Sequence, residues 1–399
     1  MKVLQINIFG NLSTGRIATD LYRSLVDSGY DGKVAYARNT IAEDVPSIKI
    51  GNKLNVYIDG VLTRLTDRAG FYSSRATKRL IMEIEKYDPD IIHLHNLHGY
   101  YINVEILFRY LKQKKKPVVW TLHDCWAFTG HCCYYSMANC EKWREGCYDC
   151  PQKKSYPSSY LWDNSKANYQ RKKELFTSIP NLHLVTVSKW LENEVKHSFL
   201  KDIPCTTIYN GIDTNVFKYS ESNFRKEKGL TGKFIILGVA STWDTRKGLE
   251  DFLKLADLIS DEYRIVLVGV GKKEQQKLKA NMIGIERTNN VQELAEIYSA
   301  ADVFFNASVE ETFGLPTVEA ISCGTPAIVY NATALPEAVT SDNGVVVEKN
   351  NVGLVYETIR KIKNKEINFK MEGTSFSKDY YFNKYIELYT ALTDKNEEK

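Results

Sequence analysis

Short apolar runs rich in valine and isoleucine recur along this chain with helix-like stretches between them, and this alternation is the strongest constraint on its fold. Near-continuous apolarity over so few residues indicates strands that are buried on both faces. Such strands belong to parallel sheets covered by helices. The runs are Lys2–Ile8, Lys33–Ala37, Ile91–Leu94, Pro117–Leu122, Leu182–Val187, Phe234–Val239, Arg264–Val268, Val303–Asn306, Ala327–Tyr330 and Gly344–Val347.

Strand and helix alternate twice over in the 399 residues. We therefore predict the α/β class, with two doubly wound, Rossmann-like domains and a ligand bound between them at the carboxyl ends of the strands. The Asn-Gly turn signal in Tyr209–Asp213 marks the joint, although it would also suit a surface turn within one domain. The predicted parts are an N-terminal domain over 1–208, a second domain over 209–376 and a final amphipathic helix within 377–399.

Composition and charge exclude several protein classes. A formal net charge of +4 is too small for a dedicated nucleic-acid binder. The longest apolar runs, such as 234–240, are far shorter than a membrane span. The segment Met1–Asn7 is polar by its fifth residue and is typical of a first strand, not of a signal peptide. The sequence thus predicts a cytosolic protein, in which eight cysteines argue against a disulfide scaffold.

Two glutamates, Glu311 and Glu319, lie eight residues apart. Proline fits best in the first turn of a helix, so Pro316 predicts that a loop ends there and that a helix runs over Thr317–Ser322 and stops at Gly324. One carboxylate then lies on a loop and the other on a helix, with loop amides and a helix N-terminus between them. This layout suits a ligand with sugar hydroxyls at both ends and phosphates in the middle. Two solvated glutamates on an amphipathic helix are the alternative.

Three further candidate sites follow predicted strands. Cations in Arg246–Gly248, next to a predicted helix N-terminus, would hold a pyrophosphate and offset its growing charge as it departs. The loop Gly10–Gly15 lets the backbone approach a ligand, with Ser13 or Thr14 as the helix cap. His123 ends its strand where it would hydrogen-bond a sugar hydroxyl. The competing interpretations are a solvated basic loop, an ordinary turn and a structural histidine.

Three histidines near one predicted strand suggest a metal site at first sight. His93 and His95 share one face of the strand because successive side chains alternate, whereas His98 belongs to the following loop. The sequence offers no evident acidic second shell around them. We therefore expect strand-end packing or contact with an acceptor, not a metal.

Cysteines crowd into an insert over 130–151. Four thiolates that include one Cys-x-x-Cys pair would close a tetrahedral zinc site, and we predict Cys132, Cys140, Cys147 and Cys150 as its ligands, with Cys133 as the alternative to Cys132. The first pair lacks the usual spacing of two to four residues, so disulfides and free thiols stay open as alternatives. Such a zinc would be structural, because four thiolates leave no open position.

Several segments carry a resemblance to family 4 glycosyltransferases. The stretch Tyr209–Asp213, followed by Phe217, looks like the hinge of that family, and Arg246–Gly248 resembles its Arg-Lys-Gly motif. Some bacterial members share the pattern around the cysteine insert. The segment 308–336 closely resembles the donor-site signature through Glu311, Phe313, Gly314, Leu315, Pro316, Glu319, Ala320, Cys323, Gly324, Pro326 and Leu335-Pro336-Glu337.

The resemblance implies a two-domain GT-B fold whose last helix crosses back onto the first domain. It also implies a retaining transfer of a sugar from a nucleotide-diphosphate sugar to a hydroxyl of a glycan or lipid-linked acceptor, in bacterial surface polysaccharide biosynthesis and without a catalytic metal cofactor. Many relatives carry a second phosphate-binding arginine where this chain has Ser241. A nucleotide-sugar epimerase of the same fold and an inactive nucleotide-sugar-binding protein are the rival functions; the paired glutamates and the intact cations argue against both.

The resemblance also assigns roles to single residues. Glu319 binds the nucleotide ribose, and Glu311 binds the hydroxyls of the donor sugar. Phe313, Gly314 and Leu315 offer backbone amides, and Arg246 with Lys247 stabilises the departing diphosphate. Gly15 lies against the donor phosphate, and His123 lies beside the transferred sugar.

Basic and aromatic residues alternate between Arg64 and Arg79, and Lys112–Lys116 form a second basic run. Faces of this kind are most often solvated. They would also suit peripheral association with the anionic inner face of a membrane that presents a lipid-linked acceptor.

Overall fold

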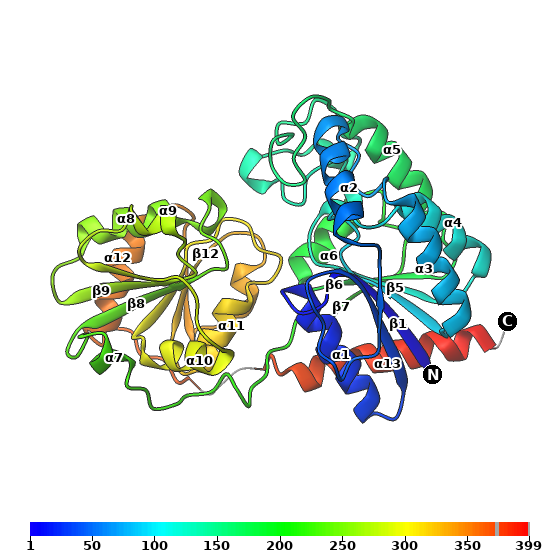
Figure 1. The fold of residues 1–399 in the computed structure, drawn as a ribbon. Coiled ribbons are helices and arrows are strands. Elements are labelled where there is room, and N and C mark those ends of the chain that lie inside the picture. Colours follow the sequence, from blue (N-terminus) through cyan, green and yellow to red (C-terminus); the bar gives the residue numbers. More distant parts are fainter. Residues whose placement is uncertain (372–374, 398–399) are drawn as a thin grey trace. The chain divides into compact units, whose positions relative to one another are not determined.

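The computed structural model describes residues 1–371 and 375–397. The chain forms two compact units (Figure 1), one made of Met1–Tyr209 together with the chain from Tyr381 onward, and one made of Asn210–Tyr380. We call them the N-terminal unit and the second unit. In the described ranges, no helix combines the length and the apolar character that crossing a lipid bilayer requires.

The N-terminal unit is built on a seven-stranded parallel sheet in the order β3-β2-β1-β4-β5-β6-β7. The chain adds β2 and β3 on one side of β1 and then β4 to β7 on the other side, so the strand order reverses between β1 and β4. The strands are β1 (Lys2–Phe9), β2 (Asp31–Arg38), β3 (Ser47–Lys49), β4 (Ile91–Leu94), β5 (Val118–Leu122), β6 (Leu182–Thr186) and β7 (Cys205–Thr207).

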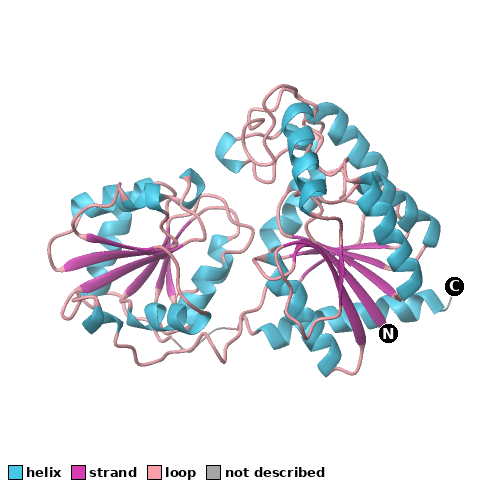
Figure 2. Cartoon of the chain, viewed as in Figure 1, coloured by secondary structure: helices cyan, strands magenta, loops and turns pink. Residues whose placement is uncertain are grey.

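Helices cover both faces of this sheet (Figure 2). They are α1 (Thr14–Asp27), α2 (Lys53–Thr66), α3 (Ser74–Tyr87), α4 (Val104–Lys114), α5 (Ser165–Phe176), α6 (Lys189–Lys196) and the long last helix α13 (Lys378–Glu397). Helix α13 buries Phe382, Tyr385 and Tyr389 in a core that also contains Val3 of β1 and Leu21 of α1. The last helix is thus an integral layer of the N-terminal unit.

The second unit repeats the architecture with a six-stranded parallel sheet in the order β10-β9-β8-β11-β12-β13. Its strands are β8 (Phe234–Val239), β9 (Tyr263–Val268), β10 (Met282–Ile285), β11 (Val303–Asn306), β12 (Ala327–Tyr330) and β13 (Gly344–Val347). Its helices are α7 (Phe224–Glu227), α8 (Leu249–Leu258), α9 (Lys272–Gln275), α10 (Val291–Ala300), α11 (Leu315–Ser322) and α12 (Val352–Lys363). Here the reversal falls between β8 and β11.

The predicted class and the two parallel sheets are confirmed, and every apolar run named above contains a strand. Three strands were not foreseen, namely β3, β7 and β10, and all three lie at sheet edges. An edge strand has a neighbour on one side only, so its residues are partly exposed, and β3 and β7 accordingly lack a continuous apolar pattern. Strand β10 is apolar but only four residues long, and one of the four is a glycine.

Candidate active site

The predicted donor-site residues of the second unit meet where its sheet order reverses. In an open parallel sheet, the loops after the two strands at such a point diverge and leave a crevice for a ligand. The loop after β8 carries Arg246–Gly248, and the loop after β11 carries Ser308–Gly314. Residues 64 positions apart in the sequence, Lys247 and Glu311, therefore meet at the carboxyl ends of these two central strands.

An ion pair joins the two loops. Lys247 Nζ donates a hydrogen bond to Glu311 Oε1, and only 16% and 11% of the two side chains are exposed. Burial by itself would raise the pKa of Glu311, but the charges of Lys247 and Arg246 and the hydrogen bond from Lys247 outweigh it, so that pKa lies below its ordinary value. Glu311 is consequently ionised at neutral pH, and its ion pair with Lys247 ties the loop after β8 to the loop after β11.

Arg246 fastens the same two loops through the backbone. Its guanidinium donates to the Glu310 carbonyl at 3.1 Å, and its own carbonyl accepts from the Val309 amide at 3.0 Å. The turn is closed by Asp244, whose carboxylate accepts from the Lys247 amide at 3.0 Å. Gly248 adopts a φ of 74°, and a Cβ there would lie 2.3 Å from the carbonyl oxygen of Ala307. Only glycine lets the loops approach this closely.

Helix α11 begins at Leu315, two residues before the predicted start at Thr317. Gly314 precedes it with a φ of 91°, and Pro316 falls in the first turn, where its missing amide hydrogen costs nothing. The Thr317 amide donates to the Gly314 carbonyl at 2.9 Å. The predicted range therefore left out both Leu315 and Pro316, although the preference of proline for a first helical turn was the reason for predicting a helix here.

Glu319 lies on α11 with 6% of its surface exposed. Its Oε2 accepts a hydrogen bond of 3.0 Å from the hydroxyl of Tyr298, a fully buried residue of α10. The Phe313 ring is buried and meets Phe376 edge-on, so its side chain serves packing and only its backbone is suited to a ligand. Ser241 lies exposed in the loop after β8.

Gly15 and His123 belong to the N-terminal unit. Gly15 is the second residue of α1, where a Cβ would lie 2.8 Å from the Phe9 carbonyl oxygen, so the glycine lets the helix begin against the end of β1. Ser13 takes the predicted N-cap position, but its side chain does not cap the helix. Ser13, at a φ of 48°, makes no capping bond, and Thr14 donates its hydroxyl to Asn7 Oδ1 at 3.1 Å instead.

His123 stands at the end of a hydrogen-bond chain that begins with Gln5. The Gln5 amide donates to the Ala18 carbonyl, which leaves Oε1 to accept from Nε2 of His95 at 3.1 Å. Nδ1 of His95 must then accept from Nε2 of His123 at 3.1 Å, so Nδ1 of neutral His123 carries a lone pair. Burial lowers the pKa of His123 to about 4. The ring is therefore a neutral hydrogen-bond acceptor.

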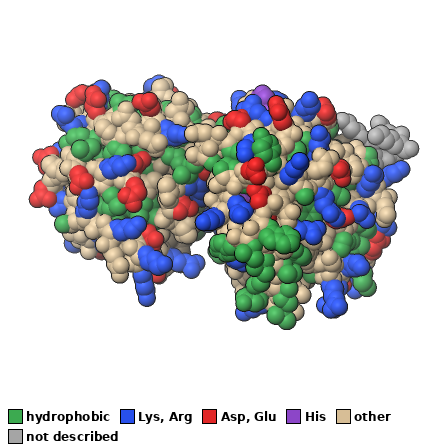
Figure 3. All heavy atoms as spheres, turned by 90° about the horizontal axis from the view of Figure 1, so that it is seen from above, with side chains coloured by type: hydrophobic (Ala, Val, Ile, Leu, Met, Phe, Trp, Pro, Cys, Tyr) green, Lys and Arg blue, Asp and Glu red, His purple; other side chains and the backbone are tan. Residues whose placement is uncertain are grey.

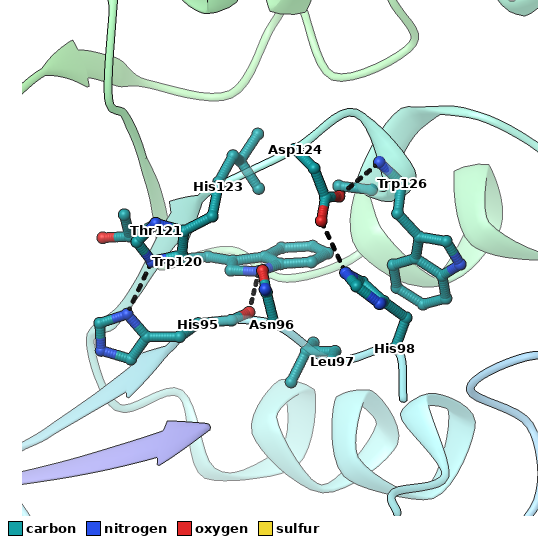
Figure 4. A pocket seen from close by; sticks show the side chains of 11 residues that line it. His95, Asn96, Leu97, His98, Trp120, Thr121, His123, Asp124 and Trp126 are labelled. Carbon is teal, nitrogen blue, oxygen red and sulfur yellow. Dashed lines mark hydrogen bonds and ion pairs between the residues drawn. The ribbon is translucent and has the colours of Figure 1, made fainter. Parts of the chain in front are cut away.

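The three histidines near β4 have different hydrogen-bond partners. His93 is buried between Thr121 Oγ1 at 2.8 Å and the Tyr389 hydroxyl at 2.7 Å, so it anchors α13. His98 turns instead to Asp124, whose carboxylate accepts from Nε2 at 2.7 Å (Figure 4). A cavity lined by His95, His98, His123 and Asp124, among others, measures about 10 Å³, which is close to the space for one water and far too small for a sugar.

The structure brings the predicted cysteine ligands into one neighbourhood. Cys132 hydrogen-bonds to Cys150, which lowers the pKa of the Cys150 thiol to about 7. Cys147 is close enough to Cys140 and Cys150 to interact with them electrostatically, and its sulfur accepts from the Gly130 amide at 3.1 Å. Within the described ranges, none of the eight cysteines forms a disulfide.

The sulfur atoms are nonetheless not gathered tightly. Among described residues, the group whose ligand atoms all lie within 4.8 Å of one another is His98, Asp124 and Cys133. Cys133 therefore faces His98, while Cys132 faces Cys150. The zinc site stays a prediction, with Cys132 as the better placed of the two candidates for the first ligand.

Elemental analysis of protein purified without chelator tests this prediction. We expect about one zinc per chain. Cys147→Ser should lower that content, whereas Cys133→Ser should not, because its sulfur lies with His98. Absence of zinc together with freely titratable thiols would reject the site, and loss of zinc in Cys133→Ser alone would move it to the His98 group.

Some residues that shape the site carry no local signal in the sequence. Tyr298 supports Glu319, Thr333 accepts from the Glu311 amide at 2.8 Å, and Gln5 fixes the tautomer of His95. Each is distant in sequence from the residue it supports. Asp124 could have been noticed, since it directly follows His123 at a strand end.

Comparisons of the sequence with known proteins identify relatives of both units. The sequence model described as Glycosyltransferase Family 4 matches residues 14–216, and that of Glycosyl transferases group 1 matches 233–364. The chain is 23% identical over 369 residues to the putative colanic acid biosynthesis glycosyl transferase WcaC of Escherichia coli, covering 88% of both. It is 25% identical over 168 residues to the O-antigen chain mannosyltransferase RfbU of Salmonella typhimurium, covering 40% and 45%.

Solved structures show the same fold. Sucrose-phosphate synthase from Thermosynechococcus elongatus superposes with a TM-score of 0.74 at 15% identity, over 99% of each chain. Anabaena HepE, solved in complex with UDP, superposes with a TM-score of 0.69 at 14% identity, over 98% of this chain and all of that one.

Proposed function

The chain belongs to glycosyltransferase family 4, and from that premise we propose that it moves a sugar from a nucleoside diphosphate sugar to an acceptor hydroxyl, with retention of the anomeric configuration. The observation that carries the proposal is the ion pair of Lys247 with Glu311 at the reversal of the second sheet, with Glu319 on the helix that follows.

Each group suits one part of such a donor. The ammonium of Lys247 and the guanidinium of Arg246 bind the diphosphate and offset the charge that grows on it as the bond to the sugar breaks. The α11 N-terminus, with the amides of Phe313–Leu315, adds donors for the same anion. The Glu319 carboxylate accepts from ribose hydroxyls, and Glu311 accepts from hydroxyls of the sugar while it orients Lys247.

The reaction needs no further reagent. The bond from sugar C1 to the diphosphate oxygen breaks, and a bond from C1 to the acceptor oxygen forms on the same face. The acceptor proton passes to the departing phosphate oxygen. Ser241 stands where many relatives have an arginine, and Arg246 supplies the second cation here.

His123 contributes from the N-terminal unit as a neutral acceptor. Its Nδ1 lone pair suits a sugar hydroxyl, and its low pKa keeps it uncharged throughout the physiological range.

The names of the relatives support a polysaccharide context. We propose a glycan or a lipid-linked saccharide as acceptor, in bacterial surface polysaccharide biosynthesis, with the protein in the cytoplasm at the inner face of the membrane. UDP in the Anabaena structure makes UDP-sugars the first donors to try.

A panel of UDP-, GDP- and dTDP-sugars tests the proposed donor class. With water as a surrogate acceptor, the wild-type protein should release nucleoside diphosphate from at least one of them. Absence of both release and thermal stabilisation across the panel would contradict the proposal.

A further inference from the structure

Helix α2 presents most of its large apolar side chains to solvent, while Val56 and Leu62 are half-buried and its fully buried positions hold small or polar residues. The inward side carries Asp59, Gly60 and Thr63, all buried. This is the reverse of a surface helix in a soluble protein. The outward side carries large apolar residues, 37% to 70% exposed, whose spacing of three or four puts them on one stripe: Leu54, Tyr57, Ile58, Val61 and Leu65.

Specific interior contacts fix this orientation. The Asp59 carboxylate accepts from the Ser73 hydroxyl at 2.5 Å and from the Thr63 hydroxyl at 3.3 Å. Gly60 lies against the ring of Tyr100, where an added Cβ would be 3.4 Å away. Turning the stripe inward would put leucine and tyrosine where glycine and short polar side chains now pack, and it would break the hydrogen bonds of Asp59. The buried contacts of α2 therefore determine that the stripe is exposed to solvent.

A neighbouring loop extends the stripe. The Tyr160 amide donates to the Arg64 carbonyl at the end of α2, at 2.8 Å. Tyr160, Leu161 and Trp162 are 59%, 63% and 64% exposed. We call the stripe and these three residues the α2 surface. Figure 3 shows a large gathering of hydrophobic side chains on the N-terminal unit, in the place that α2 takes in Figure 1.

Charge around the α2 surface is mainly positive. Over 51–72 and 151–166 the basic residues are Lys53, Arg64, Arg68, Lys153, Lys154 and Lys166. Among the acidic residues of those ranges, Asp59 and Asp67 are buried and Asp163 is exposed. At about 3.6 residues per turn, Lys53 and Arg64 lie along one edge of the apolar stripe, and the Arg64 guanidinium donates to the Gly60 carbonyl at 3.0 Å. An apolar face edged by cations, with tryptophan and tyrosine at its border, matches the boundary between acyl chains and anionic headgroups.

We propose that the α2 surface binds an anionic lipid bilayer. The apolar side chains enter the boundary of the acyl chains, and the lysines and arginines meet headgroup phosphates. Six basic residues against one exposed acidic residue, Asp163, around a wide apolar stripe favour an anionic bilayer as the partner. The binding does not depend on the proposed sugar transfer, since none of these residues belongs to the donor site.

Flotation with lipid vesicles tests the proposal on the full chain. Wild-type protein should float with vesicles of phosphatidylcholine and phosphatidylglycerol, less so as salt rises, and stay unbound with phosphatidylcholine alone. Trp162 fluorescence should shift to the blue on binding. The double variant Tyr57→Ser, Ile58→Ser should bind roughly tenfold more weakly or worse. Both residues are exposed, so folding should persist.

Two matched variants complete the test. Tyr219→Ser removes an equally exposed tyrosine, at 68%, from the second unit and should bind as wild type. Lys53→Glu with Lys154→Glu should weaken binding at low salt. The proposal is overturned if wild type ignores anionic vesicles, binds neutral ones equally well, or loses nothing in the double variant. A wild-type dimer that becomes monomeric in the double variant, with no vesicle binding, would assign the surface to a second copy instead.

Discussion

Replacing Lys247 by alanine should lower turnover by roughly 10²-fold or more, the scale found for removing one preorganised donor from a developing charge. Donor affinity should fall much less, because the lysine matters most as the diphosphate departs. Steady-state release of nucleoside diphosphate gives turnover, and calorimetry gives donor affinity.

The structure supplies the control for this experiment. Lys247 is paired with Glu311 in a nearly buried site, so its removal leaves a carboxylate without its partner. A thermal melt must therefore show that the variant is folded. Lys273→Ala changes an exposed lysine of α9 in the same unit and should keep wild-type turnover. If Lys247→Ala turns over within threefold of wild type, the phosphate role is wrong.

Replacing Glu319 by alanine should weaken nucleotide binding by about 1.5–3 kcal/mol, the typical worth of a hydrogen bond to a charged group. This corresponds to roughly 10- to 150-fold in the dissociation constant. Calorimetric titration with the nucleoside diphosphate that the panel identifies measures the loss.

Glu319 also accepts from the buried Tyr298 hydroxyl, so packing and binding effects must be separated. Glu319→Gln keeps an oxygen for Tyr298 but removes the charge, and should fall between alanine and wild type. Glu357→Ala alters an exposed glutamate of α12 and should bind as wild type. Unchanged affinity in a folded Glu319→Ala protein would remove Glu319 from the site.

The interior of each sheet was predictable because its strands are buried on both faces and read as apolar runs. Strand β11 occupies the predicted range 303–306, and β8 the range 234–239. Edge strands such as β7 were not predicted because half-exposed strands have mixed apolar and polar sequences. The first residues of helices were predicted less accurately than the strands. Gly314 opens α11 through a positive φ, which the residue type permits but does not require.

The candidate site was predictable where its chemistry is local. Glu311, Glu319 and the Arg246–Gly248 turn lie in short segments whose residue types indicate their role. Their supports come from afar: Tyr298 reaches Glu319 from another helix, and Gln5 acts on His123 through His95. The direct pairing of Lys247 with Glu311 was also not foreseen, because no spacing rule links residues on two loops. The inverted helix α2 could be recognised only once its buried side was known.

The central claim is that this chain cleaves a nucleoside diphosphate sugar with retention, and ¹H NMR of the first sugar released tests it most directly. Wild-type protein is mixed with the α-linked donor that gives the fastest release, and the anomeric proton is followed before mutarotation. The account predicts that the α anomer appears first and that Lys247→Ala abolishes its appearance on the same timescale. Initial release of the β anomer, or no release from any donor, would contradict it.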